Sequence, residues 1–498
     1  MIETHVAVYG TFLLYLVVML GIGFYAYQKT ANSSDYFLGG RSLGPWPAAL
    51  SAGASDMSGW LLLGLPGYAF ASGMESLWLA VGLLVGTWAN WLVMAKRLRT
   101  YSIVAQDALT LPEFFANRFQ DTSRLLQVIS AFFILLFFLF YTSSGLVAGG
   151  KLFETVFGME YTTAVIIGTL CVVSYTLFGG FLAVSWTDLV QGLLMAAALL
   201  IVPIAVMQAD GGMSAMFTSI SAKNPELMNL WTDSQGETLG WISLISLMAW
   251  GLGYFGQPHV LARFQACRSN QEIPTARRIA VSWTALSMAG AIFVGLTGMV
   301  YVDAHLGGSL GDGETIFMVL VNAVFHPVIA GILLAAILAA IMSTADSQLL
   351  VSSSALAEDF YKQWINPQAS AQDIVKVGRF AVMGLSLVAL VLAMNPDSSV
   401  LSLVSYAWAG FGAAFGPALL FSLYWPRMNR QGALAGIVVG ALTVVIWKQI
   451  SGGVFDLYEI VPGVLFASIA IVGVSLATPA PGESIQAQHQ KMLKALAE

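Results

Sequence analysis

The sequence predicts an all-α, polytopic membrane protein with about thirteen transmembrane helices. Of its 498 residues, 57% are hydrophobic and only 10% are charged, whereas soluble proteins carry roughly 25% charged residues. The mean hydropathy is +0.77, and apolar runs long enough to cross a bilayer recur along the chain. The second and seventh of these runs are interrupted by glycine and proline, which is typical of transporters built from inverted repeats.

The apolar runs and the basic residues together predict an orientation. The approximate cores of the runs are 6–27, 46–72, 75–95, 125–150, 161–180, 189–207, 238–257, 279–301, 316–344, 378–395, 400–425, 432–449 and 458–477. With an external N-terminus, eighteen of the 21 Lys and Arg residues, including Arg263, fall in internal loops; the exceptions are Lys151, Lys223 and Lys448. Such asymmetry sets the orientation of membrane proteins, so we expect the N-terminus outside and the C-terminus inside.

The remaining composition predicts one transmembrane domain, residues 1–478, followed by an internal tail, residues 479–498. The first run lacks the basic start of a secretory signal, so we expect a retained helix. Two cysteines support neither a disulfide framework nor a cysteine-based metal site. The net charge of −6 is weak evidence, because most charges lie in short loops, and no nucleic-acid partner is expected. Membrane lipids surround such a chain, and the sequence leaves its oligomeric state open.

The two interrupted runs lie five spans apart. The second run is broken between Gly53 and Gly67, and the seventh between Gly251 and Pro258. We therefore expect two repeats of five spans, about 46–207 and 238–425, and an odd number of spans per repeat makes the second copy inverted. The structural alternative is a pair of ordinary kinked helices, because glycine and proline are common in membrane spans.

A carboxylate, Asp56, lies inside the second run, in Ala54-Ser-Asp-Met-Ser-Gly-Trp60. An ionisable group at membrane depth is costly and is functional by default. Asp56 either attracts or ligates a cation, or it takes up a proton, and carbonyls freed by the helix break add hard oxygen ligands. The structural alternative is a buried carboxylate that is satisfied by Ser55, Ser58 or a neighbouring helix.

Hydroxyl groups line one face of the ninth run. Ala340, Ser343, Thr344 and Ser347 are spaced i, i+3, i+4 and i+7, so they share a helix face. That face can approach another backbone closely and offer oxygens to a small hard cation. The alternative is that the hydroxyls bond back to their own helix or hold helices together.

Aromatic residues near the breaks suit a small, compact, partly apolar solute. Trp250 and Tyr254 lie one turn apart on the seventh run and Pro258 one turn further, while Trp60 follows the Asp56 motif and Tyr141 lies within the fourth run. Packing in the core or against lipid is the alternative for each. Asp188, at the start of the sixth run, is expected to cap that helix, with a role in cation entry as the lesser alternative.

These residues resemble the solute:sodium symporter family, and within it the branch that carries proline rather than sugar or iodide. The resemblance covers nearly the whole chain. It rests on the segments Asp35-Tyr-Phe-Leu-Gly-Gly-Arg-Ser-Leu-Gly44, Ala54–Trp60, Gly179-Gly-Phe-Leu-Ala-Val-Ser-Trp-Thr-Asp188 and Ile337–Asp359, and on the set Trp250, Tyr254 and Pro258.

The resemblance implies a thirteen-helix, inverted-repeat fold like that of the leucine transporter, and Na+-coupled symport of L-proline across the cell inner membrane by alternating access. It implies a Na+ site made by the carbonyls of Ala54, Met57 and Ala340 and the hydroxyls of Ser343 and Thr344, with Asp56, Ser58 and Gly59 as sodium-linked positions. It implies a proline pocket at Trp60, Tyr141, Trp250, Tyr254 and Pro258. No enzymatic activity is expected.

Two kinds of alternative stay open at this point, one within transport and one outside it. The solute is another compact zwitterion or an organic acid, or the coupling ion is H+. From a different functional class, the chain is a channel, or a transporter-like sensor that binds its solute without moving it. Competition by other solutes, the pH dependence of uptake, and a test for accumulation separate these alternatives.

Overall fold

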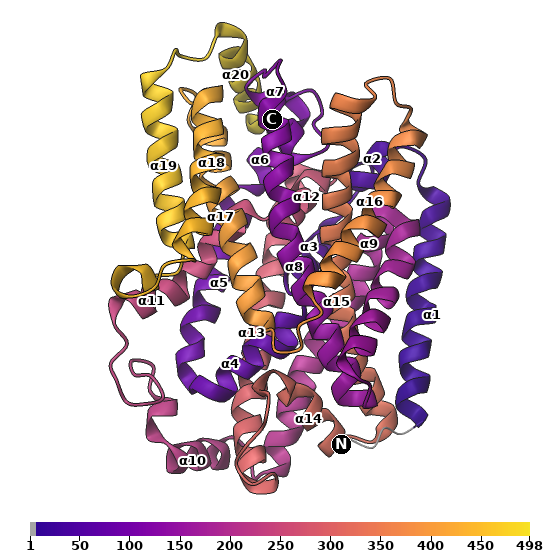
Figure 1. The fold of residues 1–498 in the computed structure, drawn as a ribbon, viewed down its shortest axis with the longest axis vertical. Coiled ribbons are helices and arrows are strands. Elements are labelled where there is room, and N and C mark those ends of the chain that lie inside the picture. The colour runs from indigo at the N-terminus through magenta and orange to yellow at the C-terminus, as the bar shows by residue number, and fades with distance from the viewer. Residues whose placement is uncertain (1–5) are drawn as a thin grey trace.

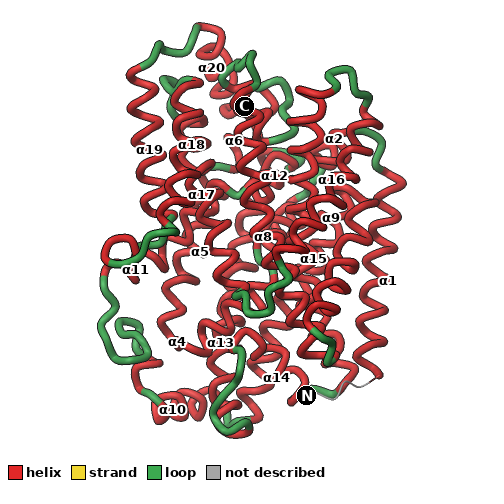
Figure 2. Tube along the Cα trace, in the orientation of Figure 1, coloured by secondary structure: helices red, strands yellow, loops and turns green. Residues whose placement is uncertain are grey.

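The computed structural model describes residues 6–498, which form one bundle of helices joined by loops (Figures 1 and 2). The first described helix, α1 (Val6–Lys29), begins at the end of the bundle opposite to the C-terminus (Figure 1). Ten helices in the described part of the chain are long and apolar enough to cross a membrane, and three shorter apolar helices accompany them. The predicted all-α membrane fold is confirmed.

The helices follow the predicted apolar runs in order. The long ones are α1 (Val6–Lys29), α5 (Ser76–Val93), α8 (Leu125–Phe157), α9 (Tyr161–Ala209), α13 (Ile273–His305), α15 (Pro327–Ser354), α16 (Ala371–Leu392), α17 (Val400–Tyr424), α18 (Arg430–Trp447) and α19 (Ile460–Ala477). Short helices between them include α2 (Ser33–Leu38), α6 (Ala95–Val104), α7 (Leu111–Arg118), α10 (Met213–Lys223) and α14 (Ile316–Val324).

The second and seventh spans are both discontinuous, as predicted. The second consists of α3 (Pro45–Asp56), the non-helical residue Met57, wider helical turns over Trp60–Gly64, and α4 (Leu65–Ser72). The seventh consists of α11 (Trp241–Met248), tighter 3₁₀ turns over Ala249–Gly256, and α12 (Pro258–Ala266). Proline suits the first turn of α12 because its missing N–H is not needed there. The seventh span therefore reaches Ala266 rather than residue 257.

Glycine sets the boundary between the fifth and sixth spans. The structure keeps α9 helical on both sides of Gly180, whose φ of 61° and ψ of −159° lie outside the helical region. A residue with a side chain rarely adopts such angles. The second half of α9 starts at Gly180, so the predicted start at residue 189 was wrong, and Asp188 lies two turns inside the helix instead of capping it.

The predicted ninth span, 316–344, divides into two helices. Phe325 is extended, the His326 side chain accepts a hydrogen bond from the Val328 amide, and Pro327 opens α15. These are start signals for a new helix, so α14 ends before them. The spanning helix α15 starts at Pro327 and continues beyond Ser354 through wider turns over Ala355–Ile365.

The end of the chain forms a docked helix. Helix α20 (Glu483–Ala497) packs against α6, beside α7 (Figure 1). Its residues His489 and Met492 are buried, and the His489 ring lies 5.7 Å from the ring of Tyr101. The Gln120 amide also donates to the Ser484 hydroxyl at 2.9 Å.

We expect α20 to detach as the pH falls. Burial, together with the charges of Arg118 and Arg97, lowers the pKa of His489 to about 4, whereas an exposed histidine titrates near ~6.5. The detached helix binds a proton below that pH and the docked helix does not. Docking is therefore complete above pH ~6.5 and weakens progressively down to about 4.

Hydrogen exchange in residues 483–497, corrected for its intrinsic pH dependence, should rise over this range. His489→Gln should remove the rise; an unchanged profile in that variant would assign it to other groups.

Candidate functional site

The break after α3 lies directly against the hydroxyl-bearing face of α15. Ser343 Oγ and Thr344 Oγ1 both donate to the Ala54 carbonyl, at 2.8 and 3.1 Å. Ser343 Oγ also lies 3.0 Å from the Ala340 carbonyl oxygen. All four residues are buried. Two carbonyl and two hydroxyl oxygens from helices far apart in the sequence thus converge on one small volume.

This donor set suits a small hard cation. Oxygen ligands are those that such cations prefer, and a carbonyl at a helix break is available to one. Met57, also predicted to contribute its carbonyl, is buried and non-helical at the break (φ −85°, ψ 84°). Within residues 6–498, no group of three or more His, Cys, Asp or Glu side chains is placed to hold a metal.

Asp56 joins the two broken spans. Tyr254 donates its hydroxyl to Asp56 Oδ2 at 2.6 Å, and Oδ1 is buried with no hydrogen-bond partner. Ser55 instead donates to the Ala52 carbonyl at 3.1 Å, and the Ser58 oxygen accepts from the Trp60 amide at 3.4 Å. The carboxylate is therefore held by the seventh span rather than by its neighbouring serines, and one of its oxygens is left for another group.

Two aromatic donors hold the backbone next to this carboxylate. Tyr141 donates its hydroxyl to the Asp56 carbonyl at 2.7 Å, and the Trp60 indole N–H reaches the same oxygen at 3.2 Å. Gly59 adjoins α8 so closely that an added Cβ would lie 2.6 Å from the Ala148 methyl group. These contacts fix the Ala54–Trp60 break against α8.

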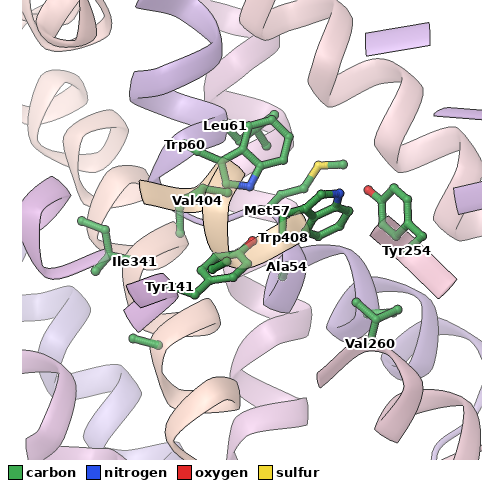
Figure 3. Packing of buried hydrophobic residues seen from close by; sticks show 14 of the residues in the cluster. Ala54, Met57, Trp60, Leu61, Tyr141, Tyr254, Val260, Ile341, Val404 and Trp408 are labelled. Carbon is green, nitrogen blue, oxygen red and sulfur yellow. The ribbon is translucent and has the colours of Figure 1, made fainter. Parts of the chain in front are cut away.

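Four of the five predicted solute-pocket residues come together. The rings of Trp60 and Trp250 lie 6.4 Å apart, while Tyr141 and Tyr254 both bond to Asp56. Figure 3 shows Trp60, Tyr141 and Tyr254 gathered around the turn that carries Ala54 and Met57. The fifth residue, Pro258, opens α12 and lines a separate cavity with residues of α7 and α15. The structure does not place it among the other four.

Two aromatic residues that the sequence did not single out complete this cluster. Trp408 of α17 packs edge-on to Tyr254 at 4.9 Å and donates its indole N–H to the Trp250 carbonyl at 2.7 Å. Tyr458 stacks on Trp250 at 5.5 Å. Gly253 admits Trp408, because a Cβ there would lie 1.9 Å from the indole nitrogen. The glycines near Trp408 in the sequence were the signal that could have indicated close packing of this side chain.

A buried ion pair adjoins the oxygen cluster. Arg263 Nη2 lies 3.3 Å from Asp188 Oδ2, and both side chains are 0% exposed. Ser51 donates to the same carboxylate at 2.6 Å and accepts from Arg263 Nε at 2.9 Å; Arg263 also donates to the Ser347 hydroxyl at 2.7 Å. The prediction that Arg263 lies in an internal loop was wrong, because α12 carries it into the bundle to meet Asp188.

Residues 36–440 match the sodium:solute symporter family. The chain belongs to the sodium:solute symporter family. The sodium/proline symporter of Salmonella typhimurium (strain LT2) is 52% identical over 484 residues, covering 97% of this chain and 95% of that protein. The high-affinity proline transporter PutP of Bacillus subtilis (strain 168) is 52% identical over 471 residues, covering 94% of this chain and 98% of that protein.

Solved structures show the same fold for this family member. A Na+-coupled sialic acid symporter in a substrate-bound outward-open state superposes with a TM-score of 0.81 at 22% identity, covering 97% of this chain and 100% of that one. A nucleobase-cation-symport-1 family transporter, in a closed conformation, reaches a TM-score of 0.56 at 15% identity, covering 93% of this chain. Membership of the sodium:solute symporter family makes the chain a multi-pass membrane transporter and not an enzyme.

Proposed function

We propose that this protein carries L-proline into the cell across the inner membrane by symport with Na+. The observation that carries the proposal is identity of about half over nearly full length to bacterial proteins named sodium/proline symporters. The converging oxygens of Ala54, Ala340, Ser343 and Thr344 support a cation site, to which Met57 adds its carbonyl. Asp56, Ser58 and Gly59 shape that site through the α3 break.

The proline site in this proposal lies between the two broken spans. Trp60, Tyr141, Trp250 and Tyr254 supply flat apolar walls around the free oxygen of Asp56. Pro258 contributes from a distance, by allowing α12 to start immediately after the break. The pocket thus combines the apolar surface and the few polar groups that a compact zwitterion needs.

Coupling follows from the position of the cation site between α3 and α15. Na+ bound there favours the state in which these helices are held together, and it shifts the equilibrium only by its differential affinity for the two states. By reciprocity, proline must tighten Na+ binding as much as Na+ tightens proline binding. Na+ affinity that is unchanged at saturating proline would contradict this coupling.

The deciding experiment is uptake of labelled L-proline into proteoliposomes that contain the purified chain. Saturable, concentrative uptake that requires an inward Na+ gradient is the expected result. Equal uptake driven by a proton gradient would identify H+ rather than Na+ as the coupling ion. Competition by a different solute with higher affinity would identify that solute rather than proline as the substrate. Binding of proline without accumulation would indicate a sensor.

Thr344→Ala should raise the Na+ concentration needed for half-maximal proline uptake. The variant removes one cation oxygen, and a contact of this kind is worth about 1 kcal/mol, so a shift of roughly 5–10-fold is expected. Specificity among competing solutes should change little. Thr344→Ser, which keeps the hydroxyl, is the matched control and should behave like the unaltered chain. An unchanged Na+ requirement in Thr344→Ala would mean that this hydroxyl only joins helices.

A further inference from the structure

The cavity that Pro258 lines is mostly apolar, with a few polar side chains, and lies between the oxygen cluster and the end of the bundle that carries α6, α7 and the C-terminus (Figure 1). It is bounded by α2, α7, α8, α12 and the second half of α15, and its lining includes Pro258, Thr110, Gln265, Ser354 and Asp359. Leu350–Ala355 lie ~9–17 Å beyond Thr344 along α15, at about 1.5 Å per residue. The cavity therefore lies between the broken spans and the end of the bundle that the basic loops assign to the inside.

Asp359 gives this cavity its chemistry. Its side chain is buried, and Oδ1 accepts from Thr110 Oγ1 at 2.9 Å and from the Gln127 amide at 2.6 Å. Oδ2 is also buried but has no hydrogen-bond partner. A buried carboxylate oxygen without a partner is costly, so this atom is prepared for a group that the cavity receives.

The charges around Asp359 favour a cation. Glu113 and Glu358 lie near enough to repel its negative charge, and Lys362 pairs with Glu358 at 3.5 Å rather than with Asp359. Gln265 also lines the cavity, with its amide nitrogen unpartnered; a 180° turn of that amide presents its oxygen instead. With the Thr110 and Ser354 hydroxyls, the cavity offers oxygens of the kind that bind alkali cations.

The size of the cavity decides between a cation and an amino acid. The volume open to a water-sized molecule is about 20 Å³, and a single water needs at least roughly 10–15 Å³ measured in this way. One small ion therefore fits, and a whole proline molecule does not.

We infer that this cavity is a second cation site, in which Asp359 holds Na+ as the ion leaves for the inside of the cell. The inference rests on the proposed Na+-coupled function, because it assigns the exit site of that ion. If this inference is right, replacing Asp359 changes how internal Na+ affects proline uptake. The dependence of uptake on external Na+ stays the same.

The test is proline uptake into proteoliposomes of uniform orientation, with Na+ varied separately on the two sides. Internal Na+ should inhibit net uptake by refilling the exit site. In Asp359→Asn, which keeps an acceptor for Thr110 and Gln127, the inhibiting internal Na+ concentration should rise by about tenfold or more, as expected for loss of a charged ligand. The external Na+ concentration for half-maximal uptake should stay the same, which also shows that the variant is folded.

Two matched variants separate a ligand from a structural or merely electrostatic role. Glu358→Gln removes a neighbouring carboxylate that does not line the cavity, and it should shift internal inhibition far less than Asp359→Asn. Thr110→Val removes one hydroxyl oxygen of the cavity and one hydrogen bond to Asp359 but keeps the carboxylate, so its shift should lie between those of Glu358→Gln and Asp359→Asn. Equal shifts on both sides of the membrane, no shift in Asp359→Asn, or inhibition that follows internal pH instead of Na+ would overturn the inference.

If the proposed function is wrong, uptake by the unaltered chain will not depend on Na+, and this is seen before any variant is tested. The cavity is then tested by binding of ²²Na+ to the purified full-length chain in a Ser343→Ala/Thr344→Ala background. Residual binding that is lost on adding Asp359→Asn supports the second site independently, and binding that is equal with and without this change overturns it.

Discussion

Asp56→Ala should abolish the stimulation of proline uptake by Na+. The substitution removes the acceptor for the Tyr254 hydroxyl, the only link described between the Asp56 side chain and the seventh span, together with the buried free oxygen Oδ1. A hydrogen bond to a charged group contributes about 1.5–3 kcal/mol, so uptake at limiting Na+ should fall by roughly 10–150-fold. The measurement is initial uptake in proteoliposomes as a function of external Na+.

Two further variants define what Asp56 supplies. Asp56→Asn keeps the shape and the acceptor for Tyr254 but removes the charge; a loss equal to that of Asp56→Ala would assign the effect to charge, and near-normal uptake would assign it to the hydrogen bond. Asp397→Ala changes an exposed aspartate near the start of α17 and should leave Na+ dependence unaltered. Normal Na+ dependence in Asp56→Ala would remove this carboxylate from the site.

The helical membrane fold could be predicted because hydropathy and backbone satisfaction restrict a spanning chain so strongly. The helix breaks could also be predicted from the sequence, because Gly53–Gly67 and Gly251–Pro258 contain the glycine and proline residues that interrupt helices. Helical spacing predicted the shared face of Ser343 and Thr344, the family resemblance implied that Ala54 meets them, and the structure places these residues in contact.

Boundaries and partners were harder to predict, because they depend on neighbours that a single sequence does not reveal. Arg263 looked like a loop cation, since hydropathy falls after Pro258; only the packing of α12 against α3 shows that Asp188 and Ser51 compensate its charge. In the same way, Gly180 could have been a packing glycine, and its backbone angles rather than its identity divide α9. Trp408 was one tryptophan among fourteen until Gly253 placed it against Tyr254.

Breaking the buried pair of Arg263 and Asp188 should destabilise the protein more than removing both charges. Arg263→Met leaves the Asp188 carboxylate uncompensated in a fully buried site, and such losses cost about 3–5 kcal/mol. Asp188→Asn strands the guanidinium in the same way. The double variant Arg263→Met/Asp188→Asn leaves no buried charge, so its unfolding temperature in detergent should lie closer to that of the unaltered chain than either single variant does.

The matched control for this cycle is the exposed pair of Arg268 and Glu272, whose arginine side chain is 59% exposed. Arg268→Met should change the unfolding temperature little, because water and salt screen a surface pair. Additive losses in the double variant would mean that Arg263 and Asp188 stabilise separate contacts, such as those to Ser347 and Ser51. A double variant whose unfolding temperature lies above those of both single variants would show that each charge of the pair serves mainly to neutralise the other. In that case the stability of the α3–α9–α12 junction depends on keeping the two charges together, and any substitution of only one of them would alter uptake through folding as well as through the site.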